Sequence, residues 1–458
     1  MKVVICGAGL VGRGIAETLA AEGNDLSIID TSPALIGAIT EALDVKGFVG
    51  HGAHPDMLAQ AGAEQADMII AVTRYDEVNM VACQIASTLF NVPLKIARVR
   101  AQTYLEPQWR DLFARDRLAV DVVISPEVEV GEMVMRRLAL PGSTDTLSFC
   151  DDKVTVAGIS CEPDCPIIDT PLRQLTELFP DLKAVIVGIS RNGQVLVPGS
   201  DDTLSVGDQV YVVAETAQIE RVLSIFGHDE VPGQRVIIAG GGNIGLYVAR
   251  QIEARNPKAR LRVIESARDR AEEVAASLKN AIVIHGSALD AAILTEADIT
   301  QADTLLAVTN DDQINLLAGI MGKRLGAQRV VSLINNPSWP PITRGLGIDA
   351  HVNPRQITVS RVLQHVRRGR IRRVHSLLEG RAEAIEAEAL ETSPLVGKPL
   401  RLLDLPDGVR IGAIIRQGVM IIPSGSVEIR ARDRVVVFAL RDKVKRVEQL
   451  FRVSLEFF

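Results

Sequence analysis

Aromatic residues are scarce in this 458-residue sequence, and it has no excess of basic charge. Phe, Trp and Tyr make up only 3% of it, which leaves little for the stacking platforms that bind single-stranded nucleic acid. Fifty Lys and Arg face 57 Asp and Glu, so the formal net charge is −7 and no broad basic face is expected. We therefore expect no nucleic-acid partner.

Cysteines and long apolar runs are scarce as well. The five cysteines are too few and too irregularly spaced for a disulfide framework, which favours a reducing compartment. Cys161 and Cys165 have no nearby Cys or His pair that would complete a metal site. No apolar run approaches the roughly 18 residues that cross a bilayer, and the first residues show no signal-peptide pattern. We expect a soluble cytoplasmic protein without a bound metal.

A long internal repeat organises the chain. Residues 2–30 and 235–265 each hold an apolar run, a glycine turn, a stretch with helical spacing, a second apolar run and a terminal carboxylate. A second pair of similar segments covers residues 186–213 and 411–438. So long a period indicates a duplicated large unit and not a solenoid. The order is A-B-A′-B′, with predicted domains at residues 1–125, 126–230, 231–354 and 355–458.

The A units read as α/β domains. Strand-like and helix-like segments alternate strictly, which predicts a doubly wound parallel sheet of the Rossmann type. The B units carry short alternating runs with Asn-Gly or Gln-Gly turns, which favours a small α+β domain with hairpins. In the first A unit we expect strands near residues 2–6, 25–30, 46–50, 67–72 and 94–98, and helices near 10–22, 33–43, 56–62 and 76–90.

The first glycine turn follows a predicted strand and opens a predicted helix. Its glycines permit a tight turn, close backbone approach to a pyrophosphate and tight helix–strand packing, and the helix N-terminus faces the negative charge. Asp30 ends the next strand, where a carboxylate accepts from ribose hydroxyls and repels a 2′-phosphate, so NAD or an adenosine nucleotide is favoured over NADP. The predicted cofactor-binding residues of this turn are Gly7, Ala8, Gly9, Leu10, Val11 and Gly12.

The second glycine turn has the same context, and Glu265 takes the place of Asp30. Glu265 is one methylene longer, so a turn kept only for packing stays open beside the nucleotide-binding interpretation. The predicted binding residues here are Gly240, Gly241, Gly242, Asn243, Ile244 and Gly245.

Two further strand ends add candidate contacts. Thr73, Arg74 and Thr309 follow the predicted fourth strands, where doubly wound sheets present residues to a ligand. We expect Asp76 to be the N-cap of the next helix. Arg98 ends a fifth strand and is placed to pair with phosphate, but its counterpart in the second copy is Leu333. We therefore expect the two sites to differ in affinity or in their preference for charged phosphates.

Nothing in the sequence points to catalysis. A dehydrogenase needs a proton donor or acceptor near the nicotinamide, and only His51 and His285 recur at equivalent places. A structural or adenine-side role fits these histidines better than catalysis. No HExxH, GxSxG or GxxxxGK motif is present. We predict no catalytic residue.

A basic run lies in the last quarter of the chain and is followed by four glutamates and no base in residues 382–391. A solvated helix is the simpler interpretation, and a contact surface for an acidic partner or for the cytoplasmic side of a membrane protein is the alternative. The run comprises Arg355, Arg361, Arg367, Arg368, Arg370, Arg372, Arg373 and Arg381.

With its paired glycine turns, the turns at Gly52 and Gly286, and the AVT-x-x-D-x-x-N stretches, the whole chain resembles the peripheral NAD-binding subunits of bacterial Trk potassium-uptake systems. These are built from two regulator-of-potassium-conductance (RCK) units. The resemblance implies a cytoplasmic ring, a homotetramer, docked under a membrane-embedded potassium-translocating subunit of the TrkH/TrkG type at the inner membrane. It also implies regulation by NAD(H), with ATP or ADP as further ligands.

By the same resemblance, Gly7 to Val11, Asp30, Thr73, Arg74 and Arg98 would form the first pocket. Gly240 to Ile244, Glu265 and Thr309 would form the second. The expected function is thus a regulatory subunit that gates potassium uptake. The rivals are a soluble NAD-dependent oxidoreductase, which the same glycine turns would suit, and a ligand-sensing transcription factor, which the negative charge and the lack of an evident helix-turn-helix disfavour.

Overall fold

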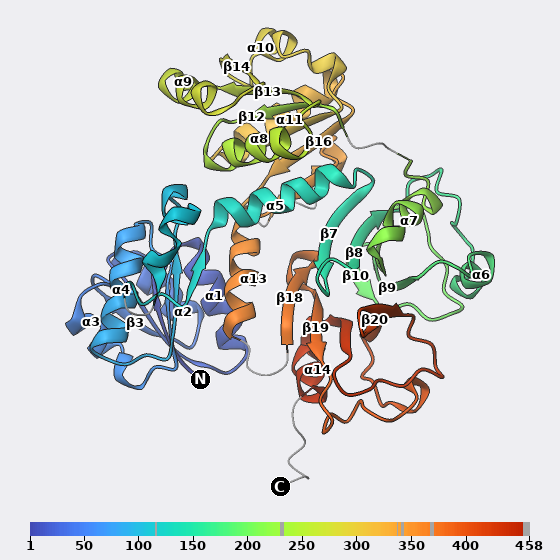
Figure 1. Ribbon diagram of the computed structural model, residues 1–458, viewed down its shortest axis with the longest axis horizontal. Coiled ribbons are helices and arrows are strands. Elements are labelled where there is room, and N and C mark those ends of the chain that lie inside the picture. The colour runs from blue at the N-terminus through green and yellow to red at the C-terminus, as the bar shows by residue number, and fades with distance from the viewer. Residues whose placement is uncertain (115–116, 230–232, 337, 340–342, 367–370, 452–458) are drawn as a thin grey trace. The chain divides into compact units, whose positions relative to one another are not determined.

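The computed structural model (Figure 1) describes residues 1–114, 117–229, 233–336, 338–339, 343–366 and 371–451. The chain divides into two compact units. The first comprises residues 1–130 with 353–366, and the second comprises 131–352 with 367–458. No helix formed by the described residues combines the length and apolar character that a bilayer crossing requires.

The first unit is built on a six-stranded sheet in which every pairing is parallel, in the order β3-β2-β1-β4-β5-β6. The order reverses between β1 and β4, which is the topological switch point of a doubly wound sheet. The predicted Rossmann-type arrangement is confirmed, and β6 is a strand that sequence reasoning missed. The strands are β1 (Lys2–Cys6), β2 (Asp25–Asp30), β3 (Lys46–Val49), β4 (Met68–Ala71), β5 (Leu94–Arg98) and β6 (Val122–Ile124); the helices are α1 (Leu10–Ala21), α2 (Pro33–Ala42), α3 (Pro55–Gln60) and α4 (Asp76–Thr88).

Alternate strand residues feed two hydrophobic cores, one on each face of this sheet. Val3 and Ile5 of β1 join the core under α1 and α2, while Val4 and Cys6 join the core under α3 and α4. Helix α13 (Pro354–Val366) completes the first core, where Val362 and Leu363 are buried. The helix that follows the second Rossmann sheet in sequence therefore helps to close the first.

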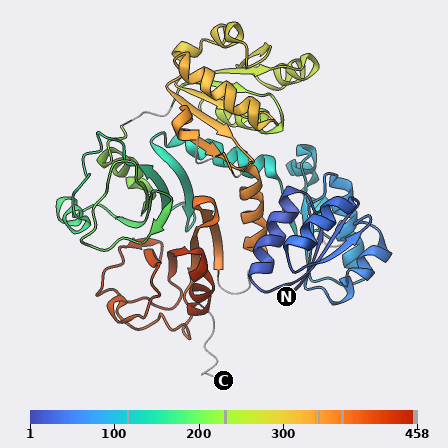
Figure 2. The ribbon, with the colours of Figure 1, turned by 180° about the vertical axis from the view of Figure 1, so that it is seen from behind.

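The second Rossmann sheet repeats the first, in the order β14-β13-β12-β15-β16-β17, and belongs to the second unit. Its strands run from yellow-green to orange in Figure 2. Here α5 (Pro126–Ala139) packs closely, because a Cβ on its Gly131 would lie 2.2 Å from the Tyr247 ring. Glu132 accepts from the Tyr247 hydroxyl at 2.8 Å. The elements are β12 (Arg235–Ala239), β13 (Arg260–Glu265), β14 (Ile282–His285), β15 (Thr304–Ala307), β16 (Arg329–Leu333), β17 (Ala350–Val352), α8 (Asn243–Arg255), α9 (Arg268–Ser277), α10 (Ala291–Glu296) and α11 (Asp312–Arg324).

Two small antiparallel sheets complete the second unit, in the orders β10-β9-β11-β8-β7 and β18-β19-β22-β20-β21. The predicted hairpin turns are present. Asn192 and Gly193 have φ of 50° and 79°, and Gln417 and Gly418 have 49° and 81°, as a type I′ turn requires. The elements are β7 (Ser143–Phe149), β8 (Val154–Ser160), β9 (Ala184–Arg191), β10 (Gln194–Leu196), β11 (Gln209–Glu215), β18 (Ile371–Leu377), β19 (Ala382–Glu388), β20 (Val409–Arg416), β21 (Val419–Ile421), β22 (Arg434–Leu440), α6 (Leu172–Leu178), α7 (Ile219–Ile225) and α14 (Val444–Leu450).

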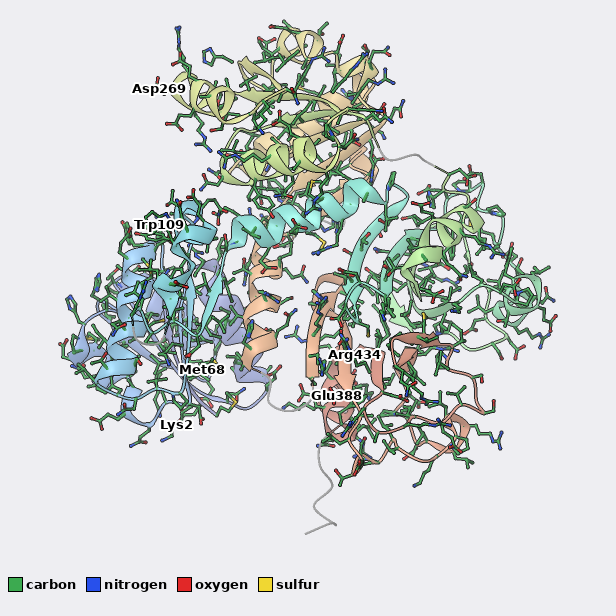
Figure 3. All side chains as sticks on the ribbon, viewed as in Figure 1. Lys2, Met68, Trp109, Asp269, Glu388 and Arg434 are labelled. Atoms are coloured by element: carbon green, nitrogen blue, oxygen red, sulfur yellow. The ribbon has the colours of Figure 1, made fainter. Side chains whose placement is uncertain are left out.

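The arginine-rich run is not one solvated helix, so that interpretation was wrong. Its first part lies in α13 and its later part in β18, which pairs antiparallel with the glutamate-rich β19. Arg372 pairs with Glu388 across these two strands, and Glu388 also stands opposite Arg434 of β22 in the register (Figure 3). The charge blocks therefore reflect strand pairing. Arg367, Arg368 and Arg370 lie outside the described residues, as does the predicted boundary after residue 230.

Candidate functional site

The first glycine turn joins β1 to α1 with the geometry that its sequence predicts. Gly7 has a φ of 111°, which L side chains rarely adopt, and a Cβ there would lie 3.0 Å from the backbone of Val72 and Thr73. A Cβ on Gly12 would lie 1.8 Å from the Gly7 carbonyl oxygen. Both glycines are thus required by close packing of the turn against α1 and the end of β4.

Gly9 is different, because a Cβ there would meet nothing within 4 Å. Its φ of −67° is open to any residue, and it is the N-cap of α1 with no side-chain cap. The N-cap of α1 therefore has open space on its Cβ side, at the place where a Rossmann turn holds a pyrophosphate. We call this turn the first cradle (residues 7–12).

Asp30 closes one side of the first cradle. One oxygen of its carboxylate accepts from the Ala8 amide at 2.7 Å, and the other accepts from the Ser32 amide at 2.9 Å. The carboxylate therefore orders the turn as well as standing where ribose hydroxyls would bind. Each oxygen retains a second lone pair that can accept from a ribose hydroxyl, as the predicted contact requires.

The end of β4 is held by a buried asparagine. Asn79 on α4 accepts from the Thr73 amide at 2.8 Å and donates to the carbonyls of Thr73 and Arg98. The Thr73 hydroxyl lies 2.7 Å from the same Asn79 oxygen. Thr73 is therefore committed to shaping the edge of the site, while Arg74 beside it is exposed.

Asp76 is not the N-cap of α4, and that prediction was wrong. Tyr75 occupies the cap position, and Asp76 is the first helical residue. Its carboxylate accepts instead from the amides of Arg100 and Ala101, at 2.9 and 2.8 Å, in the loop after β5. Asp76 thus ties α4 to that loop, a contact that local sequence did not reveal.

Arg98 lies at the end of β5 and is half-buried. Its Nε is buried and has no hydrogen-bond partner among the described residues. Burial, followed by the neighbouring Arg100, lowers the pKa of Arg98. A buried guanidinium nitrogen without a partner is costly and is suited to receive an anion.

His51 lies in the loop after β3, and its Nδ1 accepts from the Ala53 amide at 3.3 Å. His54 stacks on it with ring centroids 4.6 Å apart. The neighbouring Gly52 packs on the end of β1, where a Cβ would lie 2.9 Å from Cβ of Cys6. These contacts are those of a residue that shapes its loop.

The second cradle (residues 240–245) has the same construction. Gly240 has a φ of 111°, a Cβ on Gly245 would lie 1.9 Å from the Gly240 oxygen, and a Cβ on Gly242 would meet nothing within 4 Å. Glu265 accepts from the Gly241 amide at 2.7 Å and from the Ala267 amide at 2.9 Å. The extra methylene of Glu265 therefore does not disturb the arrangement.

The strand end beside the second cradle also matches the first. Thr309 is held by Asn315, which accepts from its amide at 2.8 Å and donates to the Leu333 carbonyl at 3.0 Å. The buried Leu333 takes the position that Arg98 has in the first copy, so the second site lacks that cation. His285 is exposed and donates to the Ser266 carbonyl at 3.1 Å.

Arg270 is a feature of the second cradle that sequence reasoning missed. It lies on α9, next to Asp269 (labelled in Figure 3), and its Nε donates to the Gly241 carbonyl at 2.8 Å. One of its terminal nitrogens is buried and has no hydrogen-bond partner among the described residues. Its counterpart on α2 is the exposed Leu35. Only an extension of the repeat alignment beyond Glu265 could have indicated Arg270.

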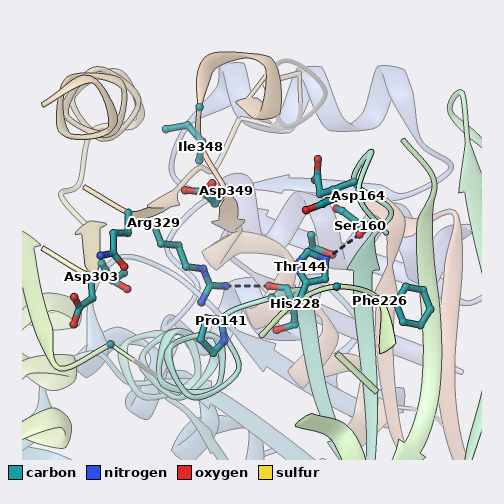
Figure 4. Close-up of a pocket in the computed structure, with 18 residues that line it drawn as sticks. Pro141, Thr144, Ser160, Asp164, Phe226, His228, Asp303, Arg329, Ile348 and Asp349 are labelled. Carbon is teal, nitrogen blue, oxygen red and sulfur yellow. Dashed lines mark hydrogen bonds between the residues drawn. The ribbon is translucent and has the colours of Figure 1, made fainter. Parts of the chain in front are cut away.

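A separate pocket of about 350 Å³ lies in the second unit, between β7 and the second Rossmann sheet (Figure 4). Three of its charged groups are already used by the protein. Arg329 donates to the Ser143 carbonyl at 3.0 Å, Asp303 accepts from the amides of Gln234 and Arg235, and Asp349 pairs with Lys323. This pocket lacks the features of the two cradles.

Chemically, the two cradles offer backbone amides, carboxylates and guanidinium groups arranged for binding. In the part of the chain that the structure describes, no group of three His, Cys, Asp or Glu side chains is placed to hold a metal ion. All five cysteines are buried and unpaired, and burial raises the pKa of Cys6 to about 12, which keeps its thiol protonated.

These features define a class of proteins with two Rossmann-type units, each carrying a glycine turn for a diphosphate and each followed by a small antiparallel domain. Comparison with known proteins narrows the class. The family model of the TrkA-N domain matches residues 3–126 and 236–354, and that of the TrkA-C domain matches residues 156–227 and 384–452. The chain belongs to the family of Trk system potassium uptake proteins TrkA.

Relatives from this family match along the full chain. A "Trk system potassium uptake protein TrkA" from Azorhizobium caulinodans is 62% identical, and one from Halomonas elongata is 38% identical; both alignments cover 100% of this chain and of the relative. Among solved structures, "GsuK channel bound to NAD" has a TM-score of 0.60 at 17% identity, over 98% of this chain and 78% of that one. At that identity the likeness shows the fold alone.

Proposed function

We propose that this protein is a cytoplasmic regulatory subunit of a potassium-uptake system, that it binds NAD(H), ATP or ADP in its two cradles, and that it catalyses no reaction. The observation that carries the proposal is the pair of open N-caps, Gly9 and Gly242, each framed by a carboxylate bound to the turn. The names of the relatives supply the potassium-uptake context.

The predicted contact residues are retained in this proposal. The first cradle, with Asp30, Thr73, Arg74 and Arg98, would hold one nucleotide. The second cradle, with Glu265 and Thr309, would hold another. The four predicted domains, with boundaries after residues 125, 230 and 354, stay a prediction as well.

A bound nucleotide acts here through its differential affinity for two conformations of the protein. Each site contributes only about 1 to 3 kcal/mol of coupling, and several sites in one assembly add to the several kcal/mol that a gate requires. We therefore propose a homotetramer on the cytoplasmic side of the inner membrane, bound to a potassium-translocating subunit of the TrkH/TrkG type.

Blocking each cradle separately tests the proposal. Gly9→Asp and Gly242→Asp place a carboxylate where a Cβ meets no atom, at an N-cap that favours Asp, so the fold should persist. The carboxylate takes up the amides that ligand phosphates would use. Titration calorimetry of the full chain should show one class of NADH or ATP sites lost in each variant and all binding lost in the double variant.

The functional readout is potassium uptake by cells that contain the membrane subunit and each variant. We expect the double variant to abolish the nucleotide dependence of uptake. Steady-state turnover of NAD or NADH with any metabolite by the purified protein would instead favour the oxidoreductase. Unchanged binding in both single variants would remove the cradles from the proposal.

A further inference from the structure

The two cradles differ most at the strand ends beside them. In the first copy, Arg74, Arg98 and Arg100 follow β4 and β5. In the second copy the same places hold neutral residues. Asn310 follows Thr309, while Leu333 and Asn335 take the positions of Arg98 and Arg100 in the matching contacts with Asn315 and Asp312. Three cations on one side therefore correspond to no charge on the other.

The three arginines of the first copy are close enough to interact. The charges of Arg100 and Arg74 lower the pKa of Arg98, whereas the carboxylates of Asp76 and Glu127 raise it. One oxygen of each carboxylate is engaged, because Asp76 Oδ2 accepts from two backbone amides and Glu127 Oε1 pairs with Arg100 at 2.9 Å. The other oxygen of each is buried without a hydrogen-bond partner among the described residues. The buried Nε of Arg98 keeps no partner among the described residues.

The cluster lies on the edge that the first cradle faces. Gly7 contacts the backbone of Val72 and Thr73, and Asn79 joins Thr73 to Arg98. In a Rossmann site, the adenosine ribose lies by the second strand and the phosphates lie over the glycine turn. The ends of β4 and β5, which lie beyond the glycine turn, should therefore contact the ligand group that is attached to the second phosphate.

In the second copy, a cation lies at the opposite end of the cradle, on the ribose side. Arg270 lies beside Gly241 and Glu265, on the ribose side, and one of its terminal nitrogens is buried without a partner among the described residues. Beyond the turn, the side-chain amide of Asn335 donates to the Asp312 carboxylate at 3.0 Å, and Leu333 is apolar. That edge suits an uncharged group.

We infer that the two cradles take different nucleotides: the first takes a nucleoside triphosphate, with its third phosphate at Arg74, Arg98 and Arg100, and the second takes a dinucleotide with an uncharged second half. This inference rests on the proposed function, since it assigns ligands to the same two cradles. The protein would then respond to the concentration of the triphosphate through the first cradle and to that of the dinucleotide through the second.

The test uses the full chain with one cradle blocked. In Gly242→Asp protein, which keeps the first cradle, calorimetry with ATP, ADP and NAD should show ATP bound about 10-fold or more tightly than ADP, because ADP lacks only the third phosphate and its charge-assisted contacts. In Gly9→Asp protein, NAD should bind at least as tightly as ATP.

Substitutions that exchange the two copies sharpen the test. Arg98→Leu, which installs the residue of the second copy, should remove most of the preference for ATP over ADP while ADP binding stays unchanged. Arg74→Asn is the second variant, because Arg74 is exposed and its loss should not disturb folding. Arg270→Leu, which installs the residue of the first copy, is the matched control and should leave the ATP preference of the first cradle intact.

The outcomes separate the two proposals. If the unblocked protein binds none of the three nucleotides, the proposed function itself fails. If Gly242→Asp protein binds ATP and ADP equally, or if Arg98→Leu and Arg74→Asn both leave the ATP preference intact, the assignment of a triphosphate fails while nucleotide binding stands. An ATP preference in the Gly9→Asp protein would overturn the assignment of the second cradle.

Discussion

At the scale of single residues, the two acidic strand ends support their glycine turns. Asp30 and Glu265 each bind one amide of their glycine turn and one amide of the following loop. The sequence predicted a ribose contact for these carboxylates and did not reveal that they support the turn. Since the Asp30 carboxylate satisfies amides of Ala8 and Ser32, its removal should affect order as well as affinity.

We predict that Asp30→Ala weakens nucleotide binding at the first cradle and lowers the stability of the first unit by about 1–3 kcal/mol, because two backbone amides lose their acceptor. Asp30→Glu is the matched control, since Glu265 makes the equivalent contacts in the second copy. Calorimetry and thermal melting measure the two effects. Unchanged affinity in Asp30→Ala would remove this side chain from the site.

At the scale of elements, α13 carries His365, whose burial disfavours the charged form of its imidazole. The Nε2 of His365 is buried without a hydrogen-bond partner among the described residues, and burial, with Arg361 next, lowers the pKa of His365. Arg361 itself pairs with Glu129 at 2.9 Å. The folded state therefore favours neutral His365.

A lowered pKa in the folded state means that the unfolded chain takes up the proton first as pH falls. We predict that the first unit loses stability below about pH 6.5, the usual pKa of histidine. His365→Leu should remove this part of the acid sensitivity, whereas a change at the exposed His54, such as His54→Gln, should not. Melting temperatures across this pH range give the answer, and equal acid sensitivity in wild-type and His365→Leu protein would contradict it.

At the scale of the whole molecule, duplication repeats both the folds and their internal supports. Asn79 and Asn315 are each fully buried and join a threonine to the end of the neighbouring strand. The paired arginine and aspartate of the small domains repeat too, as Arg191 with Asp208 and Arg416 with Asp433. What differs between the copies is the charge at the edges of the cradles.

We predict that Asn79→Ala loosens the first Rossmann domain and Asn315→Ala the second, each by about 1–3 kcal/mol, because buried amides and carbonyls lose their partners. Hydrogen exchange should show faster exchange of the Thr73 amide in the first variant and of the Thr309 amide in the second. Each variant is the control for the other. Loss of protection in both domains from a single change would contradict independent supports.

Much of the architecture was predictable because its signals are local. The predicted strands and helices of the first Rossmann domain lie within two residues of the observed ones, since glycine turns and alternating apolar runs mark their ends. Strands β6 and β17 were missed because three residues carry too little periodicity to be recognised. The Asn-Gly and Gln-Gly turns predicted hairpins because backbone φ depends on the residue itself.

The sequence by itself determined the repeat, the sheet class, the positions of both cradles and the loss of a cation at Leu333. Only the tertiary structure decided the partner of each polar side chain: Asp76 with the loop after β5, Arg270 with Gly241, and the arginine-rich run with the glutamates of β19. The physical reason is one of range. Turn geometry and periodicity follow from neighbouring residues, whereas a hydrogen bond or ion pair depends on which distant segments the fold brings together.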